Sequence, residues 1–125
     1  MKRILIIEDE KPLARALELK LAHVGFETKS AVNGEEGLAI LQEESFDLIL
    51  TDLVMPKVDG FSVLTTLREW NNATPVIVLT NLSQFEDESR ARALGAAGFF
   101  VKSDISVAEI VEHIKHVFDT SSNAT

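Results

Sequence analysis

Several short apolar runs in the chain each stop at a polar side chain that could take part in chemistry. The residues at these positions are Glu8 and Asp9, Asp52, Thr80 and Lys102. In an open parallel sheet, ligands bind at the carboxyl ends of the strands, so these five side chains are predicted to meet in one crevice. Three carboxylates placed together repel one another unless a cation offsets their charge. Oxygen ligands without Cys or His favour a hard ion such as Mg²⁺.

Asp52 is the predicted nucleophile of this group. A carboxylate can accept a phosphoryl group when a metal neutralises charge, a lysine binds the phosphoryl oxygens and a hydroxyl donates to them. Asp52 stands alone at the head of a loop, residues 52–60, whose Pro and Gly favour a defined turn. Glu8 and Asp9 are better placed as metal ligands. Any one of these carboxylates alone would more simply be a strand-end or capping group, but five such positions together favour a site.

Alternating strand and helix patterns along the chain predict the α/β scaffold that must position these groups. Strands are expected at about 3–7, 26–30, 47–51, 75–80 and 98–102. Helices are expected between them at about 11–24, 34–44, 60–69, 84–94 and 106–118. Ser-x-x-Glu spacings, Ser83 with Glu86 and Ser106 with Glu109, predict capping boxes at the last two helix starts.

The order of the strands follows from their polarity. The first, third and fourth are almost continuously apolar, as expected for central strands covered by helices on both faces. The second carries charge, which favours an edge. With right-handed crossovers, the most economical arrangement is a three-layer, doubly wound, five-stranded parallel sheet of order 2-1-3-4-5, which is flavodoxin-like.

The composition limits the classes of function. A chain of 125 residues with 46% hydrophobic residues forms one domain with a real core. Its net charge of −8 would repel nucleic-acid phosphates and anionic membranes, so no direct nucleic-acid or membrane binding is expected. It lacks cysteine, which fits a reducing compartment, and its first residues lead straight into a strand. We therefore expect a soluble, cytoplasmic protein.

On these residues the chain resembles, over essentially its whole length, the receiver domains of bacterial two-component response regulators. The motifs that carry the resemblance are Glu8-Asp9, Asp52 with Met55-Pro56 and Gly60, Thr80, Gly95-Ala96 and Lys102. The resemblance implies the same strand order and a phosphorylation-dependent signalling switch rather than an enzyme with a separate substrate. It implies a receiver domain at residues 1–119. Residues 120–125 are polar and small, which predicts a C-terminal tail that is either frayed or the start of a linker.

The resemblance also implies a role for each site residue. Asp52 would accept the phosphoryl group from a phosphohistidine of a sensor histidine kinase. Asp9 and Asp52 would bind Mg²⁺ directly, Glu8 would act largely through water, and the backbone carbonyl of Val54 would complete the protein ligands. Lys102 would bridge to the phosphoryl group, and the Thr80 hydroxyl would swing toward it.

Two departures from the usual family pattern affect the switch. Phe99 stands where Tyr is common. Its ring can still move inward and outward, but it has no hydroxyl to form a hydrogen bond. Ser103 replaces the proline that usually follows Lys102 in a cis peptide. Because a cis bond before a non-proline residue costs about 2.5–4 kcal/mol, we predict a trans peptide here.

Signal output is expected through helix 84–94, strand 98–102 and helix 106–118, toward a downstream effector protein or output domain. Helix 84–94 should be the most weakly packed, because it has no apolar residue between Phe85 and Ala91. By contrast, helix 106–118 carries a continuous apolar stripe. His23, His113 and His116 fall on helices away from the crevice and are interpreted as solvated.

Other functions fit the residues less well. A phosphatase of the haloacid dehalogenase type would want Asp-x-Asp after the first strand, where this chain has Asp9-Glu10-Lys11, and would want a cap domain. A nucleotide or flavin binder would want a glycine-rich loop at the same place. A receiver-like interaction module regulated without phosphate is disfavoured by the complete set of site positions, although it remains an open alternative.

Overall fold

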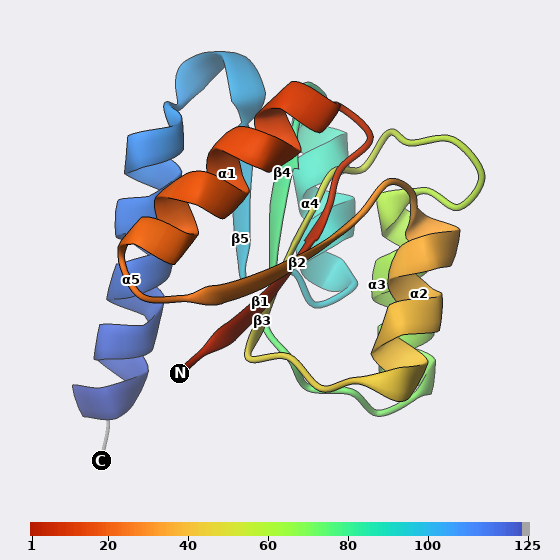
Figure 1. Cartoon of the computed structure of the whole chain (residues 1–125). Helices are drawn as coiled ribbons and strands as arrows, with labels where there is room; N and C mark the ends of the chain where they lie inside the picture. Colours follow the sequence, from red (N-terminus) through yellow and green to blue (C-terminus); the bar gives the residue numbers. More distant parts are fainter. Residues whose placement is uncertain (124–125) are drawn as a thin grey trace.

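The computed structural model describes the backbone of residues 1–123 and the side chains of residues 1–119. Its centre is a parallel sheet of order β2-β1-β3-β4-β5, which confirms the predicted topology (Figure 1). The strands are β1 (Arg3–Ile7), β2 (Glu27–Ala31), β3 (Leu48–Thr51), β4 (Val76–Thr80) and β5 (Gly98–Val101). Because all strands run in the same direction, their carboxyl ends share one edge of the sheet, at the top of Figure 1.

Helices cover both faces of the sheet and make three layers. They are α1 (Lys11–His23), α2 (Gly34–Glu43), α3 (Gly60–Glu69), α4 (Phe85–Ala93) and α5 (Val107–Asn123), with a 3₁₀ turn, η1 (Lys102–Asp104), after β5. Helices α1 and α5 lie on one face, and α2, α3 and α4 lie on the other (Figure 1). No helix in residues 1–123 is both long and apolar enough to cross a membrane.

The core consists of two apolar clusters, one on each face of the sheet. All described residues of β3 and β4, and all of β1 except Arg3, are buried, as expected for central strands. The edge strand β2 buries only Ala31 fully. On the α5 side, the ring of His113 is half-buried and lies edge-on, 4.7 Å from the ring of Phe100, so the prediction of a solvated histidine is wrong at this position.

The predicted capping box is confirmed at α5 and wrong at α4. At α5, Ser106 N–H donates to Glu109 Oε1 at 3.0 Å, and Glu109 N–H donates to Ser106 Oγ at 3.1 Å. At α4 the N-cap is Gln84, which makes no side-chain cap, and the amides of the first turn donate to its carbonyl. Ser83 therefore lies one residue too early to cap the helix.

The C-terminal helix is longer than predicted. Helix α5 continues to Asn123, five residues past the expected end at 118, so its backbone includes part of the expected polar tail at 120–125. Residues 124 and 125 of that tail lie outside the described residues. The division into a receiver domain at 1–119 and a separate tail stays a prediction.

Candidate functional site

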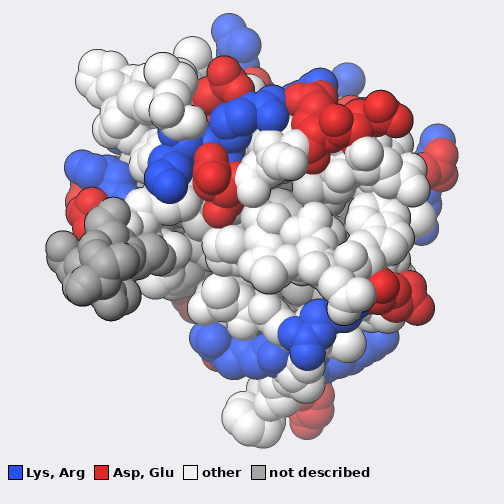
Figure 2. Space-filling view, turned by 90° about the horizontal axis from the view of Figure 1, so that it is seen from below, with Lys and Arg blue, Asp and Glu red and all other residues white. Residues whose placement is uncertain are grey.

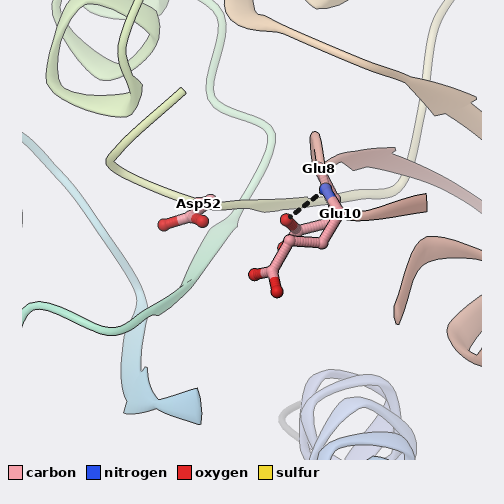
Figure 3. Close-up of side chains that lie close together, drawn as sticks. All are labelled: Glu8, Glu10 and Asp52. Atoms are coloured by element: carbon pink, nitrogen blue, oxygen red, sulfur yellow. Dashed lines mark hydrogen bonds between the residues drawn. The ribbon is translucent and has the colours of Figure 1, made fainter. Parts of the chain in front are cut away.

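Side chains that follow β1, β3 and β5 meet at the carboxyl edge of the sheet. Lys102 Nζ lies 2.8 Å from Asp52 Oδ2 and 3.0 Å from Glu8 Oε1, and it also contacts the carboxylate of Glu10. Figure 3 shows the three carboxylates around a common space, with Asp52 opposite Glu8 and Glu10. Residues separated by up to 94 positions in the chain are thus joined through one ammonium group.

The two oxygens of Asp52 have different environments. Oδ1 accepts hydrogen bonds from the backbone N–H of Leu53 at 2.6 Å and of Val54 at 3.2 Å. Oδ2 faces Lys102. The side chain is only 6% exposed, so the backbone bonds hold it in one orientation. Oδ2 is therefore the oxygen that remains for chemistry at the common space.

Close backbone contacts hold the loop that carries Asp52. A Cβ atom at Gly60 would lie 2.2 Å from the carbonyl oxygen of Asp52, so only glycine fits there. On the other side of the loop, Gly34 N–H donates to the Val58 carbonyl at 3.1 Å, and a Cβ at Gly34 would lie 2.2 Å from that oxygen. These contacts fix the path of the loop against α2 and α3.

Burial changes the acid–base behaviour of Glu8 and Lys102. Desolvation, only partly offset by the Glu10 N–H and by Lys102, raises the pKa of Glu8 to about 7. Burial also disfavours the charged form of Lys102, but hydrogen bonds to Asp52, Glu10 and Glu8 outweigh it and raise the pKa of the ammonium. Lys102 therefore remains charged at neutral pH, whereas Glu8 is partly protonated there.

Thr80 and Phe99 lie in neighbouring strands of the site. Thr80 is fully buried, and its hydroxyl oxygen accepts from Leu82 N–H at 3.3 Å. Phe99 is partly buried against the core on the α2–α4 side. Among the described residues no hydrogen bond joins Thr80 to Asp52. The Lys102–Ser103 peptide is trans, as predicted.

Glu10 is a site residue that the sequence reasoning missed, and Asp9 lies differently from expectation. Oxygens of Glu8, Glu10 and Asp52 all lie within 4.8 Å of one another, and Asp9, which is exposed, does not belong to this group. Glu10 has extended backbone angles, φ −81° and ψ 96°. In extended chain, residues two apart point the same way. The Glu8-x-Glu10 spacing was the signal that could have identified it.

The donor set fits a hard divalent cation. The three clustered carboxylates offer only oxygen ligands, and one ammonium cannot balance them when all are ionised. Mg²⁺ prefers carboxylate oxygen and water ligands. The acidic cluster could therefore bind a metal. Which carboxylates and backbone carbonyls act as direct ligands, including Asp9 and the Val54 carbonyl, stays a prediction.

A comparison with protein families decides the class of this site. The profile of the response regulator receiver domain matches residues 4–115. The chain belongs to this family. Receiver domains are phosphoacceptor signalling modules of two-component systems and pair with histidine kinases, so this receiver is a phosphorylation-dependent switch. The phosphatase alternative is set aside.

Curated relatives of this receiver are longer regulators. It is 39% identical over 116 residues to the "probable transcriptional regulator ycf27" of Porphyridium aerugineum, covering 93% of this chain and 48% of that protein. It is 34% identical over 115 residues to the "response regulator ArlR" of Staphylococcus saprophyticus, covering 92% of this chain and 51% of that protein. The chain thus spans about half the length of these relatives.

Solved structures share the receiver fold throughout. A receiver domain protein from Methanospirillum hungatei superimposes with a TM-score of 0.91 at 26% identity, covering 100% of this chain and 99% of that one. The response regulator TrrA of Thermotoga maritima, solved in complex with Mg²⁺-BeF, has a TM-score of 0.81 at 31% identity, covering 93% and 98%. The second structure holds a metal and a beryllium fluoride group in a protein of the same fold.

Proposed function

We propose that this receiver accepts a phosphoryl group on Oδ2 of Asp52. The observation that carries the proposal is the asymmetry of that carboxylate. Backbone N–H groups of Leu53 and Val54 hold Oδ1, while Oδ2 faces Lys102 at 2.8 Å in the common space with Glu8. A nucleophile fixed in one orientation needs little reorganisation before attack.

The chemistry proposed at Asp52 is transfer from a phosphohistidine of a sensor histidine kinase. A bond forms from Oδ2 to phosphorus while the bond from phosphorus to the histidine nitrogen breaks, and Asp52 becomes an acyl phosphate. Lys102 then donates to a phosphoryl oxygen instead of to the free carboxylate. The Thr80 hydroxyl would donate to a second phosphoryl oxygen after giving up its contact with Leu82 N–H.

Mg²⁺ is the proposed cofactor of this transfer. The ligands would be Asp9 and Asp52 directly, Glu8 largely through water, and the backbone carbonyl of Val54. When bound, the ion would offset the charge of the carboxylates and of the incoming phosphoryl oxygens. The all-oxygen cluster of Glu8, Glu10 and Asp52 supports a hard ion, and so does the Mg²⁺-BeF complex of the Thermotoga relative.

The proposed output surface is formed by α4, β5 and α5, with Phe99 as the switch residue between the site and this surface. The partner would be a downstream effector protein or an output domain, as the longer transcriptional regulators among the relatives suggest.

Direct binding of nucleic acid or membrane by the receiver is not proposed, since its net charge is −8. On the face in Figure 2, basic side chains form separate groups with acidic side chains beside them. We place the protein in the cytoplasm, as is typical of receiver domains.

Intact-mass measurement after treatment with a small acyl phosphate and Mg²⁺ tests the acceptor. The parent should gain one phosphoryl group, and Asp52→Asn should gain none. Asp119→Asn, which changes an exposed carboxylate on α5, is the matched control and should be labelled like the parent. Undiminished labelling of Asp52→Asn would refute the assignment of the acceptor.

Hydrogen exchange with and without beryllofluoride, a phosphoryl mimic, tests the switch. Phosphate at Asp52 should bias the arrangement of α4 and β5 through Thr80 and Phe99. Amides within residues 81–103 should therefore change their protection when the mimic binds. Unchanged protection over this range, with bound mimic demonstrated by mass or NMR, would contradict the proposed path of the signal.

A further inference from the structure

The hydrogen-bonding capacity of the Lys102 ammonium is fully used by three carboxylates. A lysine ammonium has three N–H donors. Nζ of Lys102 lies 2.8 Å from Asp52 Oδ2 and 3.0 Å from Glu8 Oε1, and its third carboxylate contact is with Glu10. The side chain of Lys102 is only 9% exposed, so water offers it little compensation for a lost partner.

Glu10 differs from the other two partners of Lys102. Glu8 and Asp52 are buried, and each also accepts from backbone N–H groups, such as Glu10 N–H to Glu8 Oε2 at 3.0 Å. The Glu10 side chain is 53% exposed. Although Glu10 is the N-cap residue of α1, its side chain makes no capping bond. Its carboxylate therefore contributes a contact with Lys102 and no described contact that α1 requires.

A cation at Glu8 and Asp52 would compete with Lys102 for its two buried partners. A divalent ion would also repel the ammonium, because like charges a few ångströms apart in a partly buried site interact strongly. Without another carboxylate, Lys102 would lose its partners inside the site and turn outward to water. The exposed Glu10 carboxylate can keep its contact while Asp52 binds the ion directly and Glu8 binds it largely through water.

We propose that Glu10 is a positioning residue that holds Lys102 beside Asp52 while Mg²⁺ shares Glu8 and Asp52. The inference rests on the proposed function, since it assumes that these carboxylates bind Mg²⁺. Glu10 acts through Lys102 and needs no direct bond to the ion. Its effect on Mg²⁺ affinity must therefore depend on whether Lys102 is present.

A double-mutant cycle measured by calorimetric titration with Mg²⁺ at pH 8 tests this dependence. The four proteins are the parent, Glu10→Gln, Lys102→Met and the double variant. In the parent background, Glu10→Gln should weaken Mg²⁺ binding by about threefold to tenfold, as is usual for coupled charged neighbours. In the Lys102→Met background, the same change should weaken it by less than about twofold.

The control is Glu43→Gln, which removes the same charge from an exposed residue at the far end of α2 and should leave Mg²⁺ affinity unchanged in both backgrounds. Unfolding midpoints confirm that each variant folds. Equal weakening by Glu10→Gln in both backgrounds would show direct attraction between Glu10 and the ion and would overturn the inference. No weakening in the parent, or a larger effect without Lys102, would overturn it as well.

The cycle separates this inference from the proposed function. If the parent takes up Mg²⁺ and shows the expected coupling but Asp52 is never phosphorylated, the acceptor assignment fails while the role of Glu10 stands. If the parent is phosphorylated at Asp52 and the coupling is absent, only the role of Glu10 fails. A parent that binds no Mg²⁺ would overturn both.

Discussion

Helices α4 and α5 lie on opposite faces of the sheet near its edge strand β5, and they are attached to the sheet in different ways. Helix α5 buries Ile110, Val111 and Ile114 against the core. Helix α4 buries only Ala91, and its first residue, Phe85, is 79% exposed. The sequence-based prediction that α4 is weakly packed is thus confirmed by its burial. Helix α5 therefore contributes more buried apolar contacts to the stability of the domain, whereas α4, which follows Thr80 in the chain, can move at a smaller cost in free energy.

Polar contacts replace apolar packing along α4. The guanidinium of Arg90 lies 4.0 Å from the ring centroid of Phe61 in α3, and Arg92 forms an exposed ion pair with Glu88 at 3.0 Å. Contacts of these kinds contribute about 0.5–1 kcal/mol each at exposed sites. A helix held in this way can shift at a small cost in free energy, as a switch element requires.

The largest effect should come from α5. Ile114→Ala should lower the free energy of unfolding by about 2–5 kcal/mol, because Ile114 is fully buried and its removal leaves a cavity. Phe85→Ala in α4 should change it by less than about 0.5 kcal/mol, since exposed side chains contribute little. Denaturation with urea measures both, and comparable losses would abolish the contrast between the two helices.

The site also lowers the stability of the fold, because it buries the carboxyl group of Glu8. The pH dependence of the free energy of unfolding should reveal this cost. The folded state binds the Glu8 proton more tightly than the unfolded chain does, because burial raises the pKa of Glu8 to about 7. Unfolding free energy without metal should therefore fall as the pH rises through the window from about 4.5 to about 7, by at most about 3 kcal/mol in total. Glu8→Gln should lack this component. Parallel pH profiles for the two proteins would refute it.

The smallest effect should distinguish the two arginines of α4. Arg90→Gln should destabilise the domain by about 0.5–1 kcal/mol, because it removes the contact with the Phe61 ring that fastens α4 to α3. Arg92→Gln is the matched control and should cost about 0.3–0.5 kcal/mol or less, since its ion pair lies within α4. Hydrogen exchange in residues 85–93 should accelerate in the first variant and stay near the parent in the second. The reverse order would disprove this account of how α4 is held.

The sequence predicted the parts of this molecule that depend on local pattern. Continuous apolar runs identified β1, β3 and β4, and the charged β2 was correctly placed at an edge. The strand ends then led to Asp52, Glu8 and Lys102, which the structure joins in one cluster. These residues could be found because parallel strands bring their carboxyl ends together whatever the details of packing.

Features that depend on tertiary detail escaped prediction. The contact of Glu10 with Lys102 requires knowing which way an extended loop residue points, and adjacent acidic residues look alike in sequence. The ring of His113 is half-buried because Phe100 lies under α5, a pairing between distant segments. The Ser83 spacing was present, yet the helix begins one position too late to use it.

The tight backbone contacts at Gly34 and Gly60 have a consequence for protein engineering. A Cβ atom added at either position would lie 2.2 Å from a carbonyl oxygen of the 52–60 loop. The loop therefore fits against α2 and α3 only with its present length and with glycine at both positions. A chimera that transplants this segment into another receiver should fold only if the loop keeps its length and the host has glycine at the positions of Gly34 and Gly60. Random libraries intended to retune signalling should leave these two codons untouched.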